Sequence, residues 1–147
     1  MIKFAAIFPG QGIKHINILS DLYKRYKIIQ QTFDNASNIL GYNLWHLIKY
    51  GPQEKLNITY YAQPAILTTS IALYKLWIKQ SNCMPQITAG HSLGEYSALV
   101  CSKVINFHDA IRLVELRGKL MDTVTKSFND YHHNGCYMQV IIGLKKK

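Results

Sequence analysis

The chain has 147 residues, of which 48% are hydrophobic, and it carries a formal net charge of +9. This composition excludes general disorder, the length fits one ordinary domain, and no apolar run approaches the roughly 20 residues of a membrane span. The basic residues are mostly Lys and are scattered rather than interleaved with aromatic residues, so we expect a globular, cytoplasmic protein that binds neither nucleic acid nor a membrane.

The first expected element is a strand at residues 2–8, where Ile2-Lys3-Phe4-Ala5-Ala6-Ile7-Phe8 is an almost continuous apolar run. Such a run is typical of a strand that is covered on both faces. It ends at Pro9-Gly10-Gln11-Gly12, where two glycines allow the backbone to approach another group closely, with Gln11 or its amide directed at that group. A simple turn is the alternative interpretation.

Helical segments follow this loop. Apolar residues recur at helical spacing between residues 19 and 33, and a shorter helical turn at residues 44–48 stops at Gly51-Pro52. In the next helix Pro64 fits the first turn, and Gln63 stands just before it. The expected buried stripe of this helix consists of Ile66, Leu67, Ser70, Ile71, Tyr74, Trp77 and Ile78. The order of strand, helices, strand and helix predicts an α/β protein.

The most informative stretch is Thr88-Ala89-Gly90-His91-Ser92-Leu93-Gly94-Glu95-Tyr96, which contains a Gly-x-Ser-x-Gly pattern. Residues 86–89 read as a short strand, and apolar residues follow the pattern at helical spacing. A serine on a sharp turn between a strand and a helix is typical of an acyl-transfer nucleophile, and Gly90 and Gly94 supply the small neighbours that such a turn requires. We therefore predict that Ser92 is catalytic and that the Leu93 amide faces a developing oxyanion, with a tight structural turn as the alternative.

The last helix begins after Asn106, a plausible N-cap with Asp109 in the first turn. A helical wheel places Arg117 in the middle of an apolar arc that we expect to be buried and that comprises Ala110, Leu113, Val114, Leu116, Leu120, Met121 and Val124. Burying an unpaired guanidinium costs several kcal/mol, so Arg117 must meet an anion. That anion is either a protein carboxylate, with Glu95 as the candidate, or the carboxylate of a ligand.

The sequence also resembles a known family. The motifs Phe8-Pro9-Gly10-Gln11-Gly12, Gln63-Pro64-Ala65, Gly90-His91-Ser92-Leu93-Gly94-Glu95, Arg117-Gly118-Lys119 and Val140-Ile141-Ile142-Gly143-Leu144 together resemble the malonyl-CoA:acyl carrier protein transacylases. Related acyltransferase domains of polyketide and fatty acid synthases share them. The sequence departs from the family at Ile13-Lys14-His15, where Ser-Gln is usual.

The resemblance implies a set of roles. Ser92 is the catalytic residue, which takes malonyl from malonyl-CoA as an ester and passes it to acyl carrier protein. The amides of Gln11 and Leu93 form the oxyanion hole, Arg117 holds the malonyl carboxylate, and Gln63 and His91 belong to the substrate-binding residues, although the His91 side chain is expected to point away from Ser92. No cofactor is implied. The three cysteines, Cys83, Cys101 and Cys136, lack metal-ligand spacing, so no metal site is expected either.

The implied fold is a hydrolase-like parallel-sheet core with a small ferredoxin-like subdomain. Residues 1–126 correspond to the N-terminal part of the core, and residues 127–147 to the start of the subdomain, with a strand at 138–143. The catalytic His of the family, in a Phe-His-Ser segment, has no counterpart here. We therefore expect a truncated core of low activity, with an open reading frame that ends through a frameshift at Lys145-Lys146-Lys147. The alternatives are a serine esterase, or a non-catalytic remnant that binds acyl carrier protein or CoA.

Overall fold

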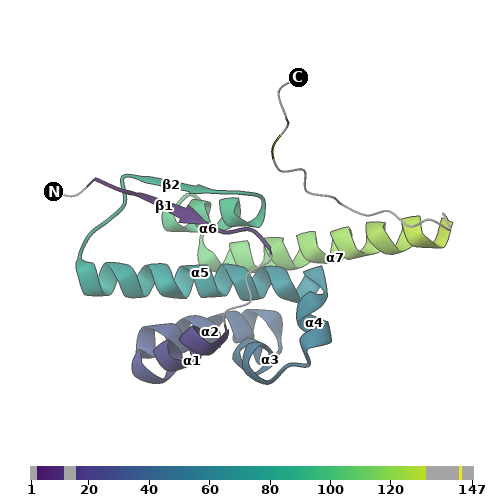
Figure 1. The fold of residues 1–147 in the computed structure, drawn as a ribbon, viewed down its shortest axis with the longest axis horizontal. Coiled ribbons are helices and arrows are strands. Elements are labelled where there is room, and N and C mark those ends of the chain that lie inside the picture. Colours follow the sequence, from purple (N-terminus) through teal and green to yellow (C-terminus); the bar gives the residue numbers. More distant parts are fainter. Residues whose placement is uncertain (1–2, 12–15, 132–142, 144–147) are drawn as a thin grey trace.

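The computed structural model describes residues 3–11, 16–131 and 143, and this part of the chain is mostly helical with two short strands (Figure 1). The elements in chain order are β1 (Ala5–Phe8), α1 (Ile16–Arg25), α2 (Lys27–Leu40), α3 (Leu44–Tyr50), α4 (Gln53–Asn57), α5 (Thr59–Ser81), β2 (Ile87–Gly90), α6 (Leu93–Cys101) and α7 (Phe107–Tyr131). The fold is therefore mixed α/β, as the sequence predicts.

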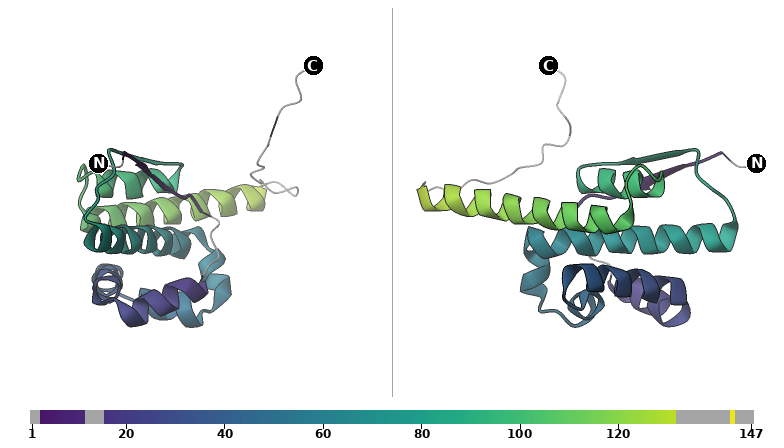
Figure 2. Two further views of the ribbon diagram at one scale, coloured as in Figure 1. Left: turned by 60° about the vertical axis from the view of Figure 1, so that its left-hand side comes forward. Right: turned by 180° about the vertical axis from the view of Figure 1, so that it is seen from behind.

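The elements form layers around the long helix α5. The two strands and α6 lie on one side of α5, and α1 to α4 lie on the other side (Figures 1 and 2). Helix α7 packs along α5, and its last turns extend past the N-terminal end of α5. The core is apolar and continuous through these layers, with Phe33, Leu67 and Val114 fully buried.

The strands pair in parallel, with Ala5 beside Ile87 and Phe8 beside Gly90. The prediction of a strand covered on both faces is wrong for the described residues, because only one face of the sheet packs against helices. On that face the Phe8 ring meets the Tyr74 ring edge-on and the Thr88 hydroxyl donates to the carbonyl of Ala98. The opposite face is open, and Ile7 is 78% exposed there.

The apolar pattern between residues 19 and 33 belongs to two helices rather than one. Helix α1 ends at Arg25 and α2 begins at Lys27, with Tyr26 in an extended conformation between them. The pattern continues across the break because both helices turn apolar side chains toward the same cluster, in which the Tyr23 ring stacks on that of Trp45 at 3.9 Å.

Helix α5 begins earlier than the sequence predicts, at Thr59, so Pro64 lies inside the helix rather than in its first turn. The predicted stripe is partly right. Leu67, Ser70 and Ile71 are buried, whereas Trp77 is 53% exposed, because that side of α5 borders open space rather than another helix. Gln63, which was placed ahead of the helix, is a fully buried residue within it.

Helix α7 is capped as predicted, since the Asn106 side chain accepts from the Asp109 amide at 2.8 Å. The predicted apolar arc is only partly buried. The buried residues are Ala110, Ile111, Val114 and Gly118, while an exposed stripe contains Leu113, Leu116, Leu120 and Val124. The wheel merged these two neighbouring faces into one. Arg117 lies within the exposed stripe and is half-buried.

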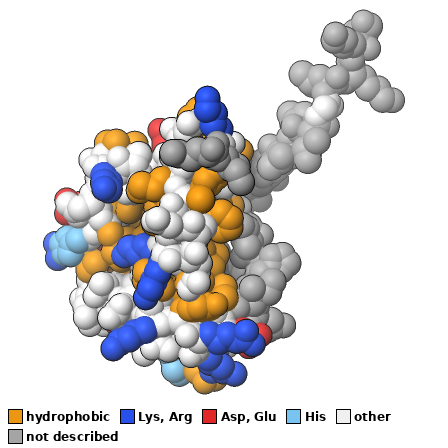
Figure 3. Space-filling view, turned by 90° about the vertical axis from the view of Figure 1, so that its left-hand side faces the viewer, with side chains coloured by type: hydrophobic (Ala, Val, Ile, Leu, Met, Phe, Trp, Pro, Cys, Tyr) orange, Lys and Arg blue, Asp and Glu red, His pale blue; other side chains and the backbone are white. Residues whose placement is uncertain are grey.

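Basic and apolar side chains share the molecular surface. Figure 3 shows Lys and Arg side chains spread among hydrophobic ones on the face that includes the left-hand end of Figure 1. No helix within residues 16–131 is both long and apolar enough to cross a membrane. The strand predicted at 138–143 lies outside the described residues except for Gly143, and so do the departures at Ile13, Lys14 and His15.

Candidate active site

Ser92 lies at the turn between β2 and α6, and its backbone is strained. Its φ of 55° and ψ of −111° fall in a region that residues with a side chain rarely adopt. Such a conformation costs on the order of 1–3 kcal/mol and is typical of functional sites. Ser92 is also the N-cap of α6, yet its hydroxyl caps no amide of that helix. Ser92 is exposed and lies on the sharp turn between a strand and a helix that the Gly-x-Ser-x-Gly pattern predicts.

The two glycines of the pattern are required by close packing. A Cβ atom on Gly90 would overlap the backbone of Gly94, and a Cβ atom on Gly94 would overlap the carbonyl of Phe8 at the end of β1. The tight approach brings the start of α6 directly against the end of β1. The loops that follow the two strands therefore meet at one edge of the sheet.

The structure brings three residues together: Ser92 from the turn before α6, Arg117 from α7 and Gln63 from α5. Arg117 donates from Nη2 to the Ser92 Oγ at 3.0 Å and from Nη1 to the Gln63 Oε1 at 2.8 Å. The guanidinium also lies over the Tyr96 ring, 5.9 Å from its centroid. Gln63 thereby fixes one edge of the guanidinium while the other faces the nucleophile.

The charge of Arg117 is not neutralised by a carboxylate in the described part of the chain. Both hydrogen-bond acceptors of its guanidinium are neutral, and no described Asp or Glu, including Glu95, lies within 4.0 Å of it. Of the two anions that the sequence allowed, the protein carboxylate is absent from residues 3–11 and 16–125. The cation beside Ser92 is therefore free to bind an anionic ligand.

The amide of Leu93 points from the first turn of α6, where the helix dipole favours negative charge. It has no hydrogen-bond acceptor among the residues that the structure describes. Gln11 lies two residues beyond Pro9 in the loop after β1 and is exposed. Both residues thus follow strands that end at the same sheet edge, which is where an oxyanion hole for Ser92 would have to be.

None of the histidines that the structure describes can serve as a base for Ser92. The His91 side chain turns toward the loop after β1, where its Nδ1 lies 3.6 Å from the position of a Cβ on Gly10. His46 packs against Tyr50, and His108 contacts Asp109 at 3.3 Å. The only described side chain that hydrogen-bonds to the Ser92 Oγ is Arg117, which cannot accept a proton.

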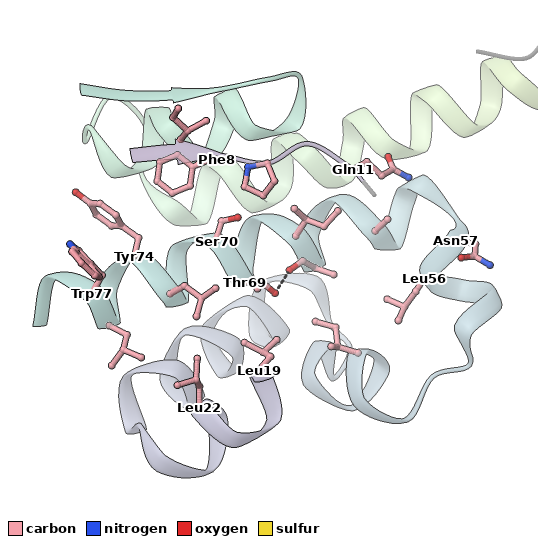
Figure 4. A pocket seen from close by; sticks show the side chains of 18 of the residues that line it. Phe8, Gln11, Leu19, Leu22, Leu56, Asn57, Thr69, Ser70, Tyr74 and Trp77 are labelled. Carbon is pink, nitrogen blue, oxygen red and sulfur yellow. Dashed lines mark hydrogen bonds between the residues drawn. The ribbon is translucent and has the colours of Figure 1, made fainter. Parts of the chain in front are cut away.

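A large apolar cavity lies elsewhere in the fold. Its volume is about 1000 Å³, and it opens between the end of β1, α1 and the middle of α5 (Figure 4). Phe8, Leu19, Tyr74 and Trp77 line it, and Gln11 stands at its rim. Ser92 and Arg117 do not line it, so we place the reactive site at the turn before α6 rather than in this cavity.

Sequence reasoning missed two residues of α7 that pack against the start of α5. Asp122 was not singled out, and Gly118 was noted only as part of a family motif. In the structure both pack against the first turn of α5, and the Asp122 carboxylate accepts from the Tyr60 amide at 2.8 Å. An isolated glycine inside a helix commonly marks a close contact with another element. Gly118 was therefore the sequence signal that could have indicated this helix interface. Among the described residues no group of three or more His, Cys, Asp or Glu could hold a metal ion.

Comparison with known proteins identifies the family. The model of the acyl transferase domain matches residues 6–130. The chain is 54% identical over 121 residues to the malonyl CoA-acyl carrier protein transacylase of Salmonella typhimurium, a match that covers 82% of this chain and 39% of that protein.

Solved structures give the same result. The acyl carrier protein S-malonyltransferase of Vibrio cholerae superposes with a TM-score of 0.78 at 52% identity, over 82% of this chain and 39% of that one. A malonyl-transacylase solved in complex with a type II polyketide synthase acyl-carrier protein gives a TM-score of 0.79 at 52% identity, over 83% and 40%. The chain thus spans about two fifths of the length of these relatives. It belongs to the acyl transferase domain family and is similar along most of its length to the malonyl-CoA:acyl carrier protein transacylases within it.

Proposed function

We propose that this chain supplies the nucleophile and the carboxylate-binding residues of a malonyl-CoA:acyl carrier protein transacylase of fatty acid biosynthesis. The observation that carries the proposal is the contact between a strained, exposed Ser92 and Arg117, whose guanidinium lies 3.0 Å from the Ser92 Oγ and meets no carboxylate among the described residues. In a malonyl thioester the free carboxylate is two bonds from the reacting carbonyl carbon. A cation beside the nucleophile is therefore well placed for this acyl group.

The reaction proceeds in two transfers through a covalent intermediate. Ser92 Oγ attacks the thioester carbonyl of malonyl-CoA, the carbon–sulfur bond breaks, and coenzyme A leaves as its thiol with the proton that the serine gives up. The phosphopantetheine thiol of acyl carrier protein then attacks the malonyl ester, and Ser92 regains a proton as the ester bond breaks. In both steps the amides of Gln11 and Leu93 donate hydrogen bonds that stabilise the negative charge developing on the carbonyl oxygen.

Arg117 selects the acyl group. When malonyl binds, its carboxylate displaces the Ser92 Oγ from the guanidinium and accepts a two-pronged pair, which is stronger than the contact with a neutral hydroxyl. Gln63 keeps the guanidinium oriented during this exchange through its 2.8 Å hydrogen bond. His91, on the outer side of the turn, faces the loop after β1 and is part of the substrate entrance.

We further propose that residues 1–126 form the N-terminal part of a hydrolase-like core and that residues 127–147 begin a ferredoxin-like subdomain, in a cytoplasmic enzyme. The uncovered sheet face at Ile7 and the exposed stripe of α7 support this assignment, because both are apolar surfaces next to Ser92. In this arrangement the remainder of the fold covers them and brings the general base. Such a base is typically worth 10² to 10⁴ in rate, so the chain alone transfers slowly.

The test is covalent labelling of the chain by malonyl-CoA over long incubation, followed by intact-mass and peptide mass spectrometry. We expect one malonyl group on Ser92, none in Ser92→Ala, and strongly reduced labelling in Arg117→Ala. Acetyl-CoA lacks the carboxylate, so its labelling should not depend on Arg117. Equal labelling of wild type by both thioesters would favour the esterase alternative, and an adduct that persists in Ser92→Ala would remove Ser92 from its role.

A further inference from the structure

Three residues on one face of helix α7 contact the first turn of α5. Glu115, Gly118 and Asp122 follow one another at spacings of three and four, so they line up along the helix. All three contact the stretch Thr59-Tyr60 at the start of α5. We call this set of contacts the α5–α7 latch. It joins segments that are more than fifty residues apart in sequence.

Asp122 caps α5 from the neighbouring helix. The N-cap position of α5 is Ile58, whose side chain has no acceptor for the amides of the first turn. The Asp122 carboxylate takes over this function, with Oδ2 accepting from the Tyr60 amide at 2.8 Å and Oδ1 from the Thr59 amide at 3.3 Å. A carboxylate at a helix N-terminus also interacts favourably with the helix dipole. This contact therefore fixes the start of α5 against α7.

The other two latch residues set the spacing of the helices. A Cβ on Gly118 would lie 2.8 Å from the Thr59 carbonyl oxygen and from the Tyr60 Cα, so only glycine permits this approach. The Tyr60 hydroxyl donates to the Glu115 Oε1 at 2.7 Å. The latch thus combines a close backbone contact with hydrogen bonds on either side of it.

Arg117 is held at the same crossing. It immediately precedes Gly118, and its partner Gln63 lies one turn after Thr59 in α5. Gln63 is fully buried and uses both ends of its amide across the interface, because it accepts from Arg117 and donates to the Met121 Sδ at 3.4 Å. The register that the latch sets between the helices therefore decides where the Arg117 guanidinium points relative to Ser92.

The two carboxylates nearest to Arg117 along α7 accept hydrogen bonds within the latch. Glu115 is taken by the Tyr60 hydroxyl and Asp122 by the amides of α5. Within residues 3–11 and 16–125 neither carboxylate reaches the guanidinium within 4.0 Å. The positive charge beside Ser92 is consequently left for a bound anion.

We propose that Asp122 is a positioning residue for Arg117: by capping α5 across the helix interface it holds the guanidinium toward Ser92 and sets the preference for acyl groups that carry a carboxylate. The structural part of this proposal stands on the latch alone. Its consequence for acyl preference rests on the proposed function. Asp122 itself touches neither Ser92 nor the expected position of the acyl group.

The structural part is tested by NMR on the chain with 15N-labelled arginine and backbone amides. Asp122→Ala should accelerate hydrogen exchange at the Thr59 and Tyr60 amides and move the Arg117 guanidinium signal toward that of a solvated arginine. Asp122→Asn keeps one oxygen acceptor and should give an intermediate shift. Asp34→Ala removes an exposed carboxylate of α2 and serves as the matched control, with no change expected.

An Arg117 signal that stays unchanged while the two amides lose protection would overturn the proposal and leave Asp122 as a helix cap only. If Asp122→Ala does not fold, the same comparison is made with Asp122→Asn, which retains the shape of the side chain.

The consequence for acyl preference is tested by labelling of Ser92 with malonyl-CoA and acetyl-CoA. Asp122→Ala should lower the ratio of malonyl to acetyl labelling by about tenfold, since one charge-assisted pair is weakened. Asp34→Ala should leave the ratio unchanged. An equal loss with both thioesters contradicts the positioning role. If wild type is not labelled by either thioester, the proposed function fails, while the NMR comparison still decides whether Asp122 positions Arg117.

Discussion

Replacing Gly118 with alanine tests how closely α7 approaches α5. The added Cβ would lie 2.8 Å from two backbone atoms, the Thr59 carbonyl oxygen and the Tyr60 Cα, and 3.0 Å from the Thr59 carbonyl carbon. Ordinary contact begins at about 3.4 Å, so one helix must shift by roughly 0.6 Å. Such overpacking costs about 1–3 kcal/mol, and here the obstacle is backbone that the latch holds in place. The better helix propensity of alanine offsets about 1 kcal/mol. We expect a net loss of about 1 kcal/mol, the middle of the resulting range of about 0–2 kcal/mol.

Urea unfolding followed by far-ultraviolet circular dichroism measures this loss. With a slope of about 1–3 kcal/mol per molar urea, a loss of about 1 kcal/mol should lower the midpoint by roughly 0.5 M. Lys119→Ala changes the next, exposed position of the same helix and should stay within about 0.5 kcal/mol of wild type. A Gly118→Ala protein that exceeds the wild type in stability would refute the close approach described above and, with it, the geometry of the latch.

Three further predictions concern capping, pH and the exposed stripe. Asn106→Ala should cost about 1 kcal/mol in thermal unfolding, because the Asp109 amide loses its acceptor; no change would mean that α7 frays at this end. The hydrogen bond to Glu115 raises the pKa of Tyr60 to about 12. The stability that this contact contributes is present below the ordinary tyrosine pKa of about 10 and is lost as pH rises toward 12. The pH dependence of unfolding in this window should therefore be shallower in Tyr60→Phe, and identical slopes would contradict the contact. Leu116→Gln combined with Leu120→Gln should leave the free energy of unfolding within about 0.5 kcal/mol and reduce self-association in sedimentation; a loss of 2–5 kcal/mol would indicate buried leucines.

The turn at Ser92 was predictable because its sequence pattern is local, with Gly90, Ser92 and Gly94 within five residues. The requirement for Gly90 is local as well, since a Cβ there would overlap Gly94, whereas the requirement for Gly94 comes from the distant carbonyl of Phe8 at the end of β1. The N-cap at Asn106 is local in the same sense. The position of Ser92 on a strand-to-helix turn and the start of α7 could therefore be predicted before the fold was known.

The errors arise where burial depends on the rest of the fold. A wheel finds an apolar side of a helix, but it cannot tell which part of that side meets a neighbour. On α7, Val114 is buried while Leu116 and Leu120 are exposed, although all three belonged to the predicted arc. The open face of β1 has the same origin, since Ile7 is apolar without being covered.

The environment of Arg117 was only half predictable. Its place among apolar residues indicated a cation in an unusual environment. Its hydrogen-bond partners, Gln63 in α5 and Ser92 in the turn before α6, are distant in sequence and could not be predicted in the same way. Asp122 carries no signal in the local sequence. Its role as a cap for α5 depends on how two helices cross, which no spacing within either helix records.

The pairing of β1 with β2 has a consequence for the order of folding. Ala5 pairs with Ile87, and helices α1 to α5 lie between the two strands in the sequence. The sheet can therefore close only after these helices have packed, or by closing a large loop of unfolded chain. Long-range contacts of this kind form late, because the chain loses the entropy of closing a large loop before the contacts can stabilise it. Contacts among neighbouring helices such as α2 and α3 are nearer in sequence and can form while the ribosome is still adding β2. In pulsed hydrogen exchange during refolding we expect the amides of α2 to be protected before those of β1, so the turn that exposes Ser92 is assembled last.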